Sequence, residues 1–226
     1  MEEKYKLILG DCIEKMKDIP DESIDCVITD PPYGLDKNMA NDKIEGLDKL
    51  LTNAIKEMCR VIKDKHSILM FFDCGKNLPI AFHSIQEGGG HFERYIQFYK
   101  PNDCSMPHNR VLRKSEALLL FSKSGVLHHE GEKFMHDVII GNVKKQEYGH
   151  FYHPSVKSLD IIKKLILVNT HPNYLILDPF MGSGTTGVAC MNLNRKFIGI
   201  EISKDYYDIA EKRIHEASLN QKLSDL

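Results

Sequence analysis

The stretch that decides the fold runs from Leu177 to Gly187 and reads L-D-P-F-M-G-S-G-T-T-G. An apolar run typical of a buried strand, Tyr174–Leu177, leads into it, and a helical pattern begins within it at Thr185. Glycines at such a strand-to-helix turn let the backbone reverse tightly and let a ligand lie against it without a Cβ in the way. The stretch therefore predicts a ligand-binding turn of an α/β fold.

The glycine spacing alone leaves several interpretations of this turn open. Gly182–Gly187 formally fits G-x-G-x-x-G, so an NAD-dependent oxidoreductase is one of them, and a plain structural glycine turn is another. A P-loop is excluded because no Lys follows the second glycine.

The side chains around the glycines favour a different cofactor. Asp178 directly precedes the loop, where its carboxylate suits an ammonium group that NAD does not have. The hydroxyls of Ser183, Thr185 and Thr186, with the N–H groups of a helix start, suit a carboxylate. Glu201 ends the next predicted strand, the place where an acidic residue holds ribose hydroxyls in nucleotide-binding folds. An ammonium and a carboxylate together describe the methionine end of S-adenosylmethionine.

Short apolar runs alternate with helical patterns along the chain, which predicts a mostly parallel sheet wrapped by helices on both faces. The expected strands are Lys6–Gly10, Asp25–Asp30, Ser67–Phe72, Arg94–Tyr99, Ala117–Phe121, Tyr174–Leu177 and Phe197–Ile200. The expected helices are Gly46–Ile62, Asn77–Gln86, Val156–Asn169, Thr185–Leu193 and Lys204–Ala217. Residues 124–152 show neither period and are predicted to be an irregular insertion in a single domain spanning residues 1–226.

A second motif, Asp30-Pro31-Pro32-Tyr33, follows the predicted strand Asp25–Asp30. Each proline fixes its own φ and pushes the preceding residue towards an extended conformation, so the turn is stiff. It presents a carboxylate, carbonyl acceptors and an aromatic face, which suit the exocyclic amino group of a planar base. Acceptors on both N–H bonds of such an amine stabilise the positive charge that develops during attack on a methyl group. A rigid proline turn without a ligand is the alternative.

The composition argues against a membrane, secreted, disulfide-rich or metal-binding protein. The 226 residues, 42% hydrophobic and 27% charged, are typical of a globular domain. No run of about eighteen apolar residues and no secretory signal is present, so a cytoplasmic location is expected. The six cysteines contain no C-x-x-C pair and the histidines lack ligand spacing, so we predict neither disulfides nor a metal site.

The charge is unevenly distributed. The whole chain has a net charge of −2, whereas residues 94–164 hold twelve Lys and Arg against seven Asp and Glu. A basic segment in a near-neutral chain is what a protein facing phosphate would have, although a solvated surface explains it equally well. Arg110, Arg113 and Lys114 are the candidates for phosphate contact, and Lys100 is placed near the pocket that would receive the planar base.

These motifs together resemble those of the DNA amino-methyltransferases that modify N6 of adenine or N4 of cytosine, in the β-class order with Asp-Pro-Pro-Tyr first. The resemblance covers nearly the whole chain. It implies that Asp30, Pro31, Pro32 and Tyr33 form the catalytic motif and that Asp178, Phe180, Gly182, Ser183, Gly184, Thr185 and Glu201 hold S-adenosylmethionine. It also implies that Asp11 and Cys12 contact the adenine ring of the cofactor, and that Lys157, in His153–Lys157, helps to hold the cofactor.

The resemblance further implies a Rossmann-like, doubly wound methyltransferase fold, circularly permuted so that the catalytic half comes first. Its expected reaction is S-adenosylmethionine-dependent methylation of adenine N6 in double-stranded DNA, because Asp precedes Pro-Pro-Tyr. The target base must leave the stack to reach Asp30. The family also suggests a homodimer and either a solitary methylase or the partner of a separate restriction endonuclease. An N4-cytosine enzyme, an RNA or protein-amide methyltransferase, and a non-catalytic DNA-binding protein are the alternatives.

Overall fold

The computed structural model describes residues 4–35, 45–101, 114–127, 136–141, 147–148, 151–152 and 157–224. The strands are β1 (Tyr5–Leu9), β2 (Ile24–Thr29), β3 (Ile62–Phe72), β4 (His91–Tyr99), β5 (Ser115–Ser122), β6 (Val138–Ile140), β7 (Glu147–Tyr148), β8 (Phe151–Tyr152), β9 (Leu175–Asp178) and β10 (Lys196–Glu201). The helices are α1 (Cys12–Met16), α2 (Leu47–Val61), α3 (Leu78–Glu87), α4 (Leu159–Asn169), α5 (Thr185–Asn192) and α6 (Lys204–Ser224).

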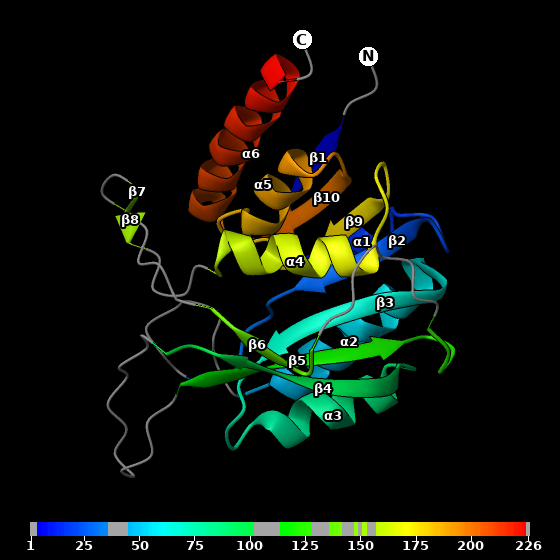
Figure 1. Ribbon diagram of the computed structural model, residues 1–226. Coiled ribbons are helices and arrows are strands. Elements are labelled where there is room, and N and C mark those ends of the chain that lie inside the picture. The colour runs from blue at the N-terminus through cyan, green and yellow to red at the C-terminus, as the bar shows by residue number, and fades with distance from the viewer. Residues whose placement is uncertain are drawn as a thin grey trace.

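One sheet of eight strands dominates the molecule, in the order β1-β10-β9-β2-β3-β5-β4-β6 (Figure 1). The pairs from β1 to β3 in this order are all parallel, whereas β5 runs antiparallel to both β3 and β4. The predicted α/β fold with a mostly parallel sheet is therefore confirmed. The circular reordering of the usual methyltransferase fold stays a prediction.

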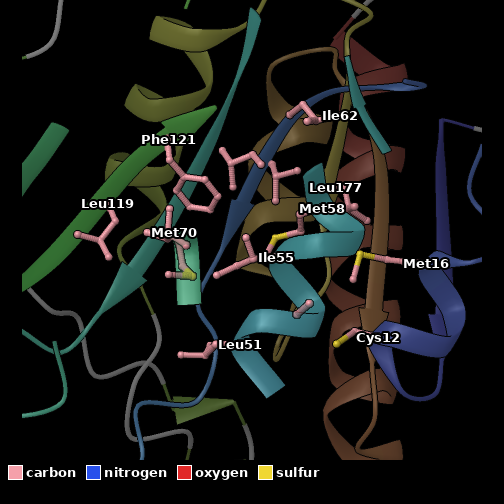
Figure 2. Close-up of a cluster of buried hydrophobic side chains, with 14 of the residues drawn as sticks. Cys12, Met16, Leu51, Ile55, Met58, Ile62, Met70, Leu119, Phe121 and Leu177 are labelled. Atoms are coloured by element: carbon pink, nitrogen blue, oxygen red, sulfur yellow. The ribbon is translucent and has the colours of Figure 1, made fainter. Parts of the chain in front are cut away.

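The apolar core has two layers because successive side chains of a central strand point to opposite faces. In β2, Val27 belongs to one buried cluster, and Cys26 and Ile28 belong to the other. The first cluster lies under α1, α2 and α3, and Figure 2 shows Leu51, Ile55 and Met58 of α2 within it. The second lies under α4, α5 and α6, so both faces of the sheet are covered, as the continuous apolar runs predict.

The seven predicted strands and five predicted helices are present, with ends that differ by a few residues. The expectation that residues 124–152 are irregular is wrong at Val138–Ile140, which forms β6 and pairs parallel with β4 at the edge of the sheet. Three β-branched residues suit an edge strand, but polar and glycine neighbours hide so short a run from a search for periodicity. The short pair β7 and β8 also lies in this segment.

The sheet order brings the two halves of the chain together. Strand β9, close to the C-terminus, pairs with β2, close to the N-terminus, with Cys26 opposite Ile176 and Val27 opposite Leu177. Because the two strands are parallel, their carboxyl ends lie at the same edge of the sheet. That edge is where both sequence motifs begin.

Candidate active site

The predicted site residues gather at the carboxyl ends of four neighbouring parallel strands. Asp11 follows β1, Glu201 ends β10, Asp178 ends β9 and Asp30 follows β2, and these strands are consecutive in the sheet. Ligands of open α/β sheets bind outside the carboxyl ends of the strands. The fold thus places both motifs, far apart in sequence, along one edge.

The glycine loop between β9 and α5 depends on glycine at two positions. Gly182 and Gly184 have φ angles of +53° and +81°, which side chains with a Cβ rarely adopt. A Cβ on Gly184 would lie 2.8 Å from that of Ala210, so this glycine lets α6 pack closely against the loop. A Cβ on Gly182 would meet no described atom within 4 Å. The backbone at Gly182 therefore faces open space, as a cradle for a ligand requires.

Asp178 is buried at the start of this loop and ties three segments together. Its Oδ1 accepts hydrogen bonds from the Thr29 hydroxyl at 2.9 Å and from the Phe180 N–H at 3.2 Å, and its Oδ2 accepts one from Thr186 at 2.8 Å. Burial raises the pKa of Asp178 to about 7, although these hydrogen bonds act in the opposite direction. A carboxylate has about four acceptor sites, so the predicted contact with an ammonium group is still open to it.

Glu201 holds the loop from the neighbouring strand. Its Oε2 accepts a hydrogen bond from the Gly182 N–H and its Oε1 accepts one from the Ser203 N–H, each at 2.8 Å. Burial raises the pKa of this carboxyl above its usual value, and the two N–H donors lower it. Each oxygen retains acceptor capacity next to the open face of Gly182, which suits the predicted ribose hydroxyls.

Asp11 has a structural task that the sequence analysis missed. Its Oδ1 accepts hydrogen bonds from the N–H groups of Ile13 and Glu14 and so caps α1. Cys12 is buried beside it, and burial raises the pKa of its thiol to about 12. The thiol is therefore an apolar packing group rather than a nucleophile. The predicted adenine contact of these two residues stays a prediction.

The hydroxyls at the start of α5 have a partner that the sequence analysis missed. The buried guanidinium of Arg213, in α6, donates a hydrogen bond to the Ser183 Oγ at 2.9 Å and another to the Ser183 carbonyl oxygen, and it lies 3.5 Å from the Thr185 hydroxyl. The Arg213 guanidinium thus holds the glycine loop against α6. The spacing of Arg213 from the buried Ala210, Ile214 and Ala217 places it on the inward face of α6, which is the signal that could have identified it.

The Asp-Pro-Pro-Tyr turn has a defined geometry in the structure. The Tyr33 hydroxyl donates a hydrogen bond to Asp30 Oδ1, and the Tyr33 ring lies against Phe72 with ring centroids 5.2 Å apart. Asn77 fixes the backbone by donating hydrogen bonds from Nδ2 to the carbonyl oxygens of Tyr33 at 2.8 Å and Gly34 at 3.1 Å. The turn is therefore held in place, and 28% of the Asp30 side chain is exposed.

Lys157 lies at the Asp-Pro-Pro-Tyr motif. Its Nζ is 3.0 Å from Asp30 Oδ2, 3.0 Å from the Tyr33 hydroxyl and 2.7 Å from Oε2 of Glu116, a residue of β5 that the sequence analysis gave no separate role. Burial alone would lower the pKa of Lys157, but the two carboxylates outweigh it and raise that pKa. The ammonium therefore stays charged. The predicted contact of Lys157 with the cofactor stays a prediction.

Two of the four residues predicted to contact DNA, Lys100 and Lys114, lie in the described parts of the chain. The Lys100 ammonium donates a hydrogen bond to Glu116 Oε1 at 2.9 Å, and only 11% of that lysine side chain is exposed. Lys114 is partly exposed and donates a hydrogen bond to the Pro101 carbonyl oxygen at 3.1 Å. Arg110 and Arg113 lie outside the described residues.

Neither a metal site nor a membrane-spanning helix occurs in the described residues. No group of three or more His, Cys, Asp or Glu side chains in these parts of the chain is arranged to hold a metal ion. Nor does any helix within the same ranges have the length and apolar character needed to cross a membrane.

Comparison with known proteins gives a consistent result. The family model described as DNA methylase, of the N6 and N4 class, matches residues 24–212. Type II methyltransferase M.BglII of Bacillus subtilis is 32% identical over 244 residues, which cover 91% of this chain and 67% of that protein. The solved complex of M1.HpyAVI with S-adenosylmethionine is 29% identical with a TM-score of 0.71, covering 93% of this chain and 99% of that one. The cytosine-N4-specific PvuII DNA methyltransferase shares the fold, with a TM-score of 0.78 at 19% identity over 98% of this chain and 93% of that one.

Proposed function

This chain belongs to the DNA methylase family of N6-adenine and N4-cytosine amino-methyltransferases, which use S-adenosylmethionine, and we propose that its target is the N6 amino group of adenine in double-stranded DNA. One observation carries the assignment of the site. The Thr29 hydroxyl, one residue before Asp30, donates a hydrogen bond to Asp178 across 2.9 Å. A group bound at the glycine loop and a base bound at Asp30 would therefore lie side by side.

The cofactor-binding residues are arranged to hold a cationic amino acid joined to a nucleoside. When bound, S-adenosylmethionine supplies the electrophilic methyl group. The open face of Gly182 receives the ligand, Glu201 accepts hydrogen bonds from ribose hydroxyls, and Asp178 pairs with the ammonium group. We further propose that Phe180, Ser183, Gly184 and Thr185 complete the cofactor site. Asp11, Cys12 and Lys157 are proposed to make the cofactor contacts that the resemblance implies.

The Asp-Pro-Pro-Tyr turn is arranged to hold the target base. The exocyclic amine of adenine is a weak nucleophile because its lone pair is delocalised into the ring. We infer that this amine donates one hydrogen bond to Asp30 and one to the Pro31 carbonyl oxygen, while Tyr33 stacks on the ring and Pro32 stiffens the turn. These acceptors stabilise the positive charge that grows on the nitrogen during attack. The protein then acts mainly by positioning the partners, without a covalent enzyme intermediate.

The preference for adenine rests on the Asp at the first position of the motif. A cytosine-N4 enzyme is the second candidate, because the PvuII enzyme of that specificity has the same fold. The deciding experiment incubates the protein with labelled cofactor and, in parallel, with duplex DNA, RNA or protein. The labelled substrate is then identified and, for DNA, the methylated nucleoside and its flanking bases. We expect N6-methyladenine. N4-methylcytosine would move the assignment to the second candidate, label on RNA or protein alone would exclude DNA as the substrate, and no label at all would indicate a non-catalytic DNA-binding protein.

Recognition of DNA is the remaining part of the proposal. We propose that residues 124–152 form a short target-recognition insertion in a single domain, and that Lys100, Arg110, Arg113 and Lys114 contact the DNA. The relative M.BglII is named a type II methyltransferase, which supports the proposal that a separate restriction endonuclease of the same specificity accompanies this protein. A homodimer is proposed from the family resemblance.

A further inference from the structure

Glu116 is the centre of a row of charged side chains whose arrangement the roles above do not explain. It lies on β5, where its Oε1 accepts a hydrogen bond from Lys100 Nζ at 2.9 Å and its Oε2 accepts one from Lys157 Nζ at 2.7 Å. The exposed fractions of these three side chains are 15%, 11% and 10%. Burying three charges is costly, so their retention at a site suggests a task there.

The row ends at the proposed catalytic carboxylate. Lys157 Nζ also lies 3.0 Å from Asp30 Oδ2, and the Tyr33 hydroxyl donates its hydrogen bond to Oδ1. Both oxygens of Asp30 therefore have a protein partner before any base arrives. Each oxygen still has an acceptor site, but an amino group that donates a hydrogen bond to Oδ2 shares that oxygen with the Lys157 ammonium, whose charge makes it a weaker acceptor.

We propose that Glu116 is a positioning residue for methyl transfer, which competes with Asp30 for the Lys157 ammonium and so keeps the Asp30 carboxylate available to the target amine. This inference rests on the proposed role of Asp30. Without Glu116, Lys157 would have Asp30 as its remaining carboxylate partner in the row, and the carboxylate would be held by an ion pair instead of receiving the base.

The electrostatics of the row give the direction of the effect. Burial would raise the pKa of Glu116, but Lys157 and Lys100 outweigh it and lower that pKa to about 2, so Glu116 stays ionised. Burial raises the pKa of Asp30, Lys157 lowers it, and the charge of Glu116 raises it. Around Asp30, the other groups in the balance are the Tyr33 hydroxyl, whose pKa is well above its usual value, and Asp178 on the neighbouring strand. Replacing Glu116 by a neutral residue should lower the pKa of Asp30.

Neutralising Lys100 should have the opposite effect. Glu116 would then have Lys157 as its remaining cation in the row and would draw it away from Asp30, so the pKa of Asp30 should rise. The two substitutions, Glu116→Gln and Lys100→Met, both break the same buried ion pair. A general loss of packing would move the Asp30 titration in the same direction in both variants, whereas the proposed competition moves it in opposite directions.

The chain offers a matched control. Glu57 of α2 forms an ion pair of 2.8 Å with Arg60 and has an exposed fraction of 16%, close to that of Glu116, but it lies outside the site. Glu57→Gln therefore measures the cost of neutralising a comparably buried, paired glutamate. The measurements use the full-length chain: titration of Asp30 by ¹³C NMR in the cofactor-free protein, assigned with Asp30→Asn, then cofactor affinity and kcat against pH.

The expected result for Glu116→Gln is an Asp30 titration about one pH unit lower and a kcat about tenfold lower than wild type, with cofactor affinity unchanged within about twofold. Lys100→Met should raise the titration, and Glu57→Gln should leave it in place. An unchanged titration in Glu116→Gln, or a shift in the same direction in Lys100→Met, would overturn the proposal. If Glu116→Gln does not fold, the test rests on Lys100→Met. An Asp30 pKa that does not rise in that variant is incompatible with competition between Glu116 and Asp30 for Lys157. Turnover in Asp30→Ala would instead remove the proposed function, a distinct outcome.

Discussion

The Thr29 hydroxyl and the Asp178 carboxylate, 149 positions apart in sequence, share a hydrogen bond of 2.9 Å in the buried interior. This bond joins the ends of β2 and β9 at the point where each strand leads into a functional motif. It fixes the Asp-Pro-Pro-Tyr turn relative to the glycine loop. The distance between a bound methyl donor and a bound amine then depends on this contact, and small errors in such a distance cost large factors in rate.

Removing that hydroxyl should therefore impair both folding and cofactor binding. In Thr29→Val, the buried Asp178 loses one of its donors, which should lower the free energy of unfolding by about 1–3 kcal/mol. Thr29→Ser keeps the hydroxyl and is the matched control. Thermal unfolding with and without cofactor provides the measurement, and equal stability of the valine and serine variants would show that the bond contributes little.

Cofactor affinity should increase as pH rises towards 7. Burial raises the pKa of Asp178 to about 7, so below that pH the carboxyl is mostly protonated and cannot pair with an ammonium group. From the ionised fraction, affinity should be about fivefold higher at pH 7 than at pH 6, with a proton released on binding. Calorimetry in buffers of different ionisation enthalpy measures both the affinity and the number of protons released.

The control for this pH dependence is Asp178→Asn, which should bind the cofactor weakly and without that pH dependence. The cofactor-free protein gives a second check. Its native state retains a proton on Asp178 that the unfolded chain releases above about pH 4, so this group makes the fold less stable as pH rises from about 4 to 7. If the ammonium group of the cofactor pairs with a residue other than Asp178, the cofactor affinity of the wild-type protein should not change between pH 6 and pH 7.

The two loop glycines should respond differently to alanine. Both substitutions force a Cβ into a left-handed conformation, at about 1–2 kcal/mol each. Gly184→Ala adds a clash with Ala210 at 2.8 Å and should cost about 1–3 kcal/mol more in stability. Gly182→Ala meets open space, so its main effect should be on cofactor affinity. Unfolding and binding measurements on the pair test this contrast, which equal loss of stability would contradict.

Glu201 should be needed both for cofactor binding and for the stability of the glycine loop. Glu201→Gln removes charge-assisted hydrogen bonds worth about 1.5–3 kcal/mol each, so affinity should fall about 10- to 100-fold for each ribose hydroxyl that the carboxylate binds. Gln keeps the size of the side chain but has one acceptor oxygen, so either the Gly182 or the Ser203 N–H loses its acceptor and the free energy of unfolding should also fall, by about 1–3 kcal/mol. Binding of S-adenosylmethionine and of adenosine should weaken alike, whereas an unchanged affinity for adenosine would exclude the ribose role.

The sequence predicted the strands and the placement of the two motifs because long apolar runs and strand-end residues follow from local pattern. It could not predict α1, since Cys12–Met16 spans little more than one turn and its cap, Asp11, looks like any polar residue. Nor could it predict that Lys157 contacts Glu116, 41 positions away, because that contact depends on how β5 inserts antiparallel beside β3. Which buried charges pair depends on tertiary packing, and the helix and strand propensities of neighbouring residues carry no information about it.

The most direct test of the central claim is methyl transfer to duplex DNA by Asp30→Ala, measured beside cofactor affinity in the same variant. Asp30 is proposed to hold the target amine, and the residues proposed to bind the cofactor lie at the ends of neighbouring strands. We expect no detectable N6-methyladenine from this variant, with S-adenosylmethionine bound about as tightly as in wild type. Turnover equal to that of wild type would contradict it.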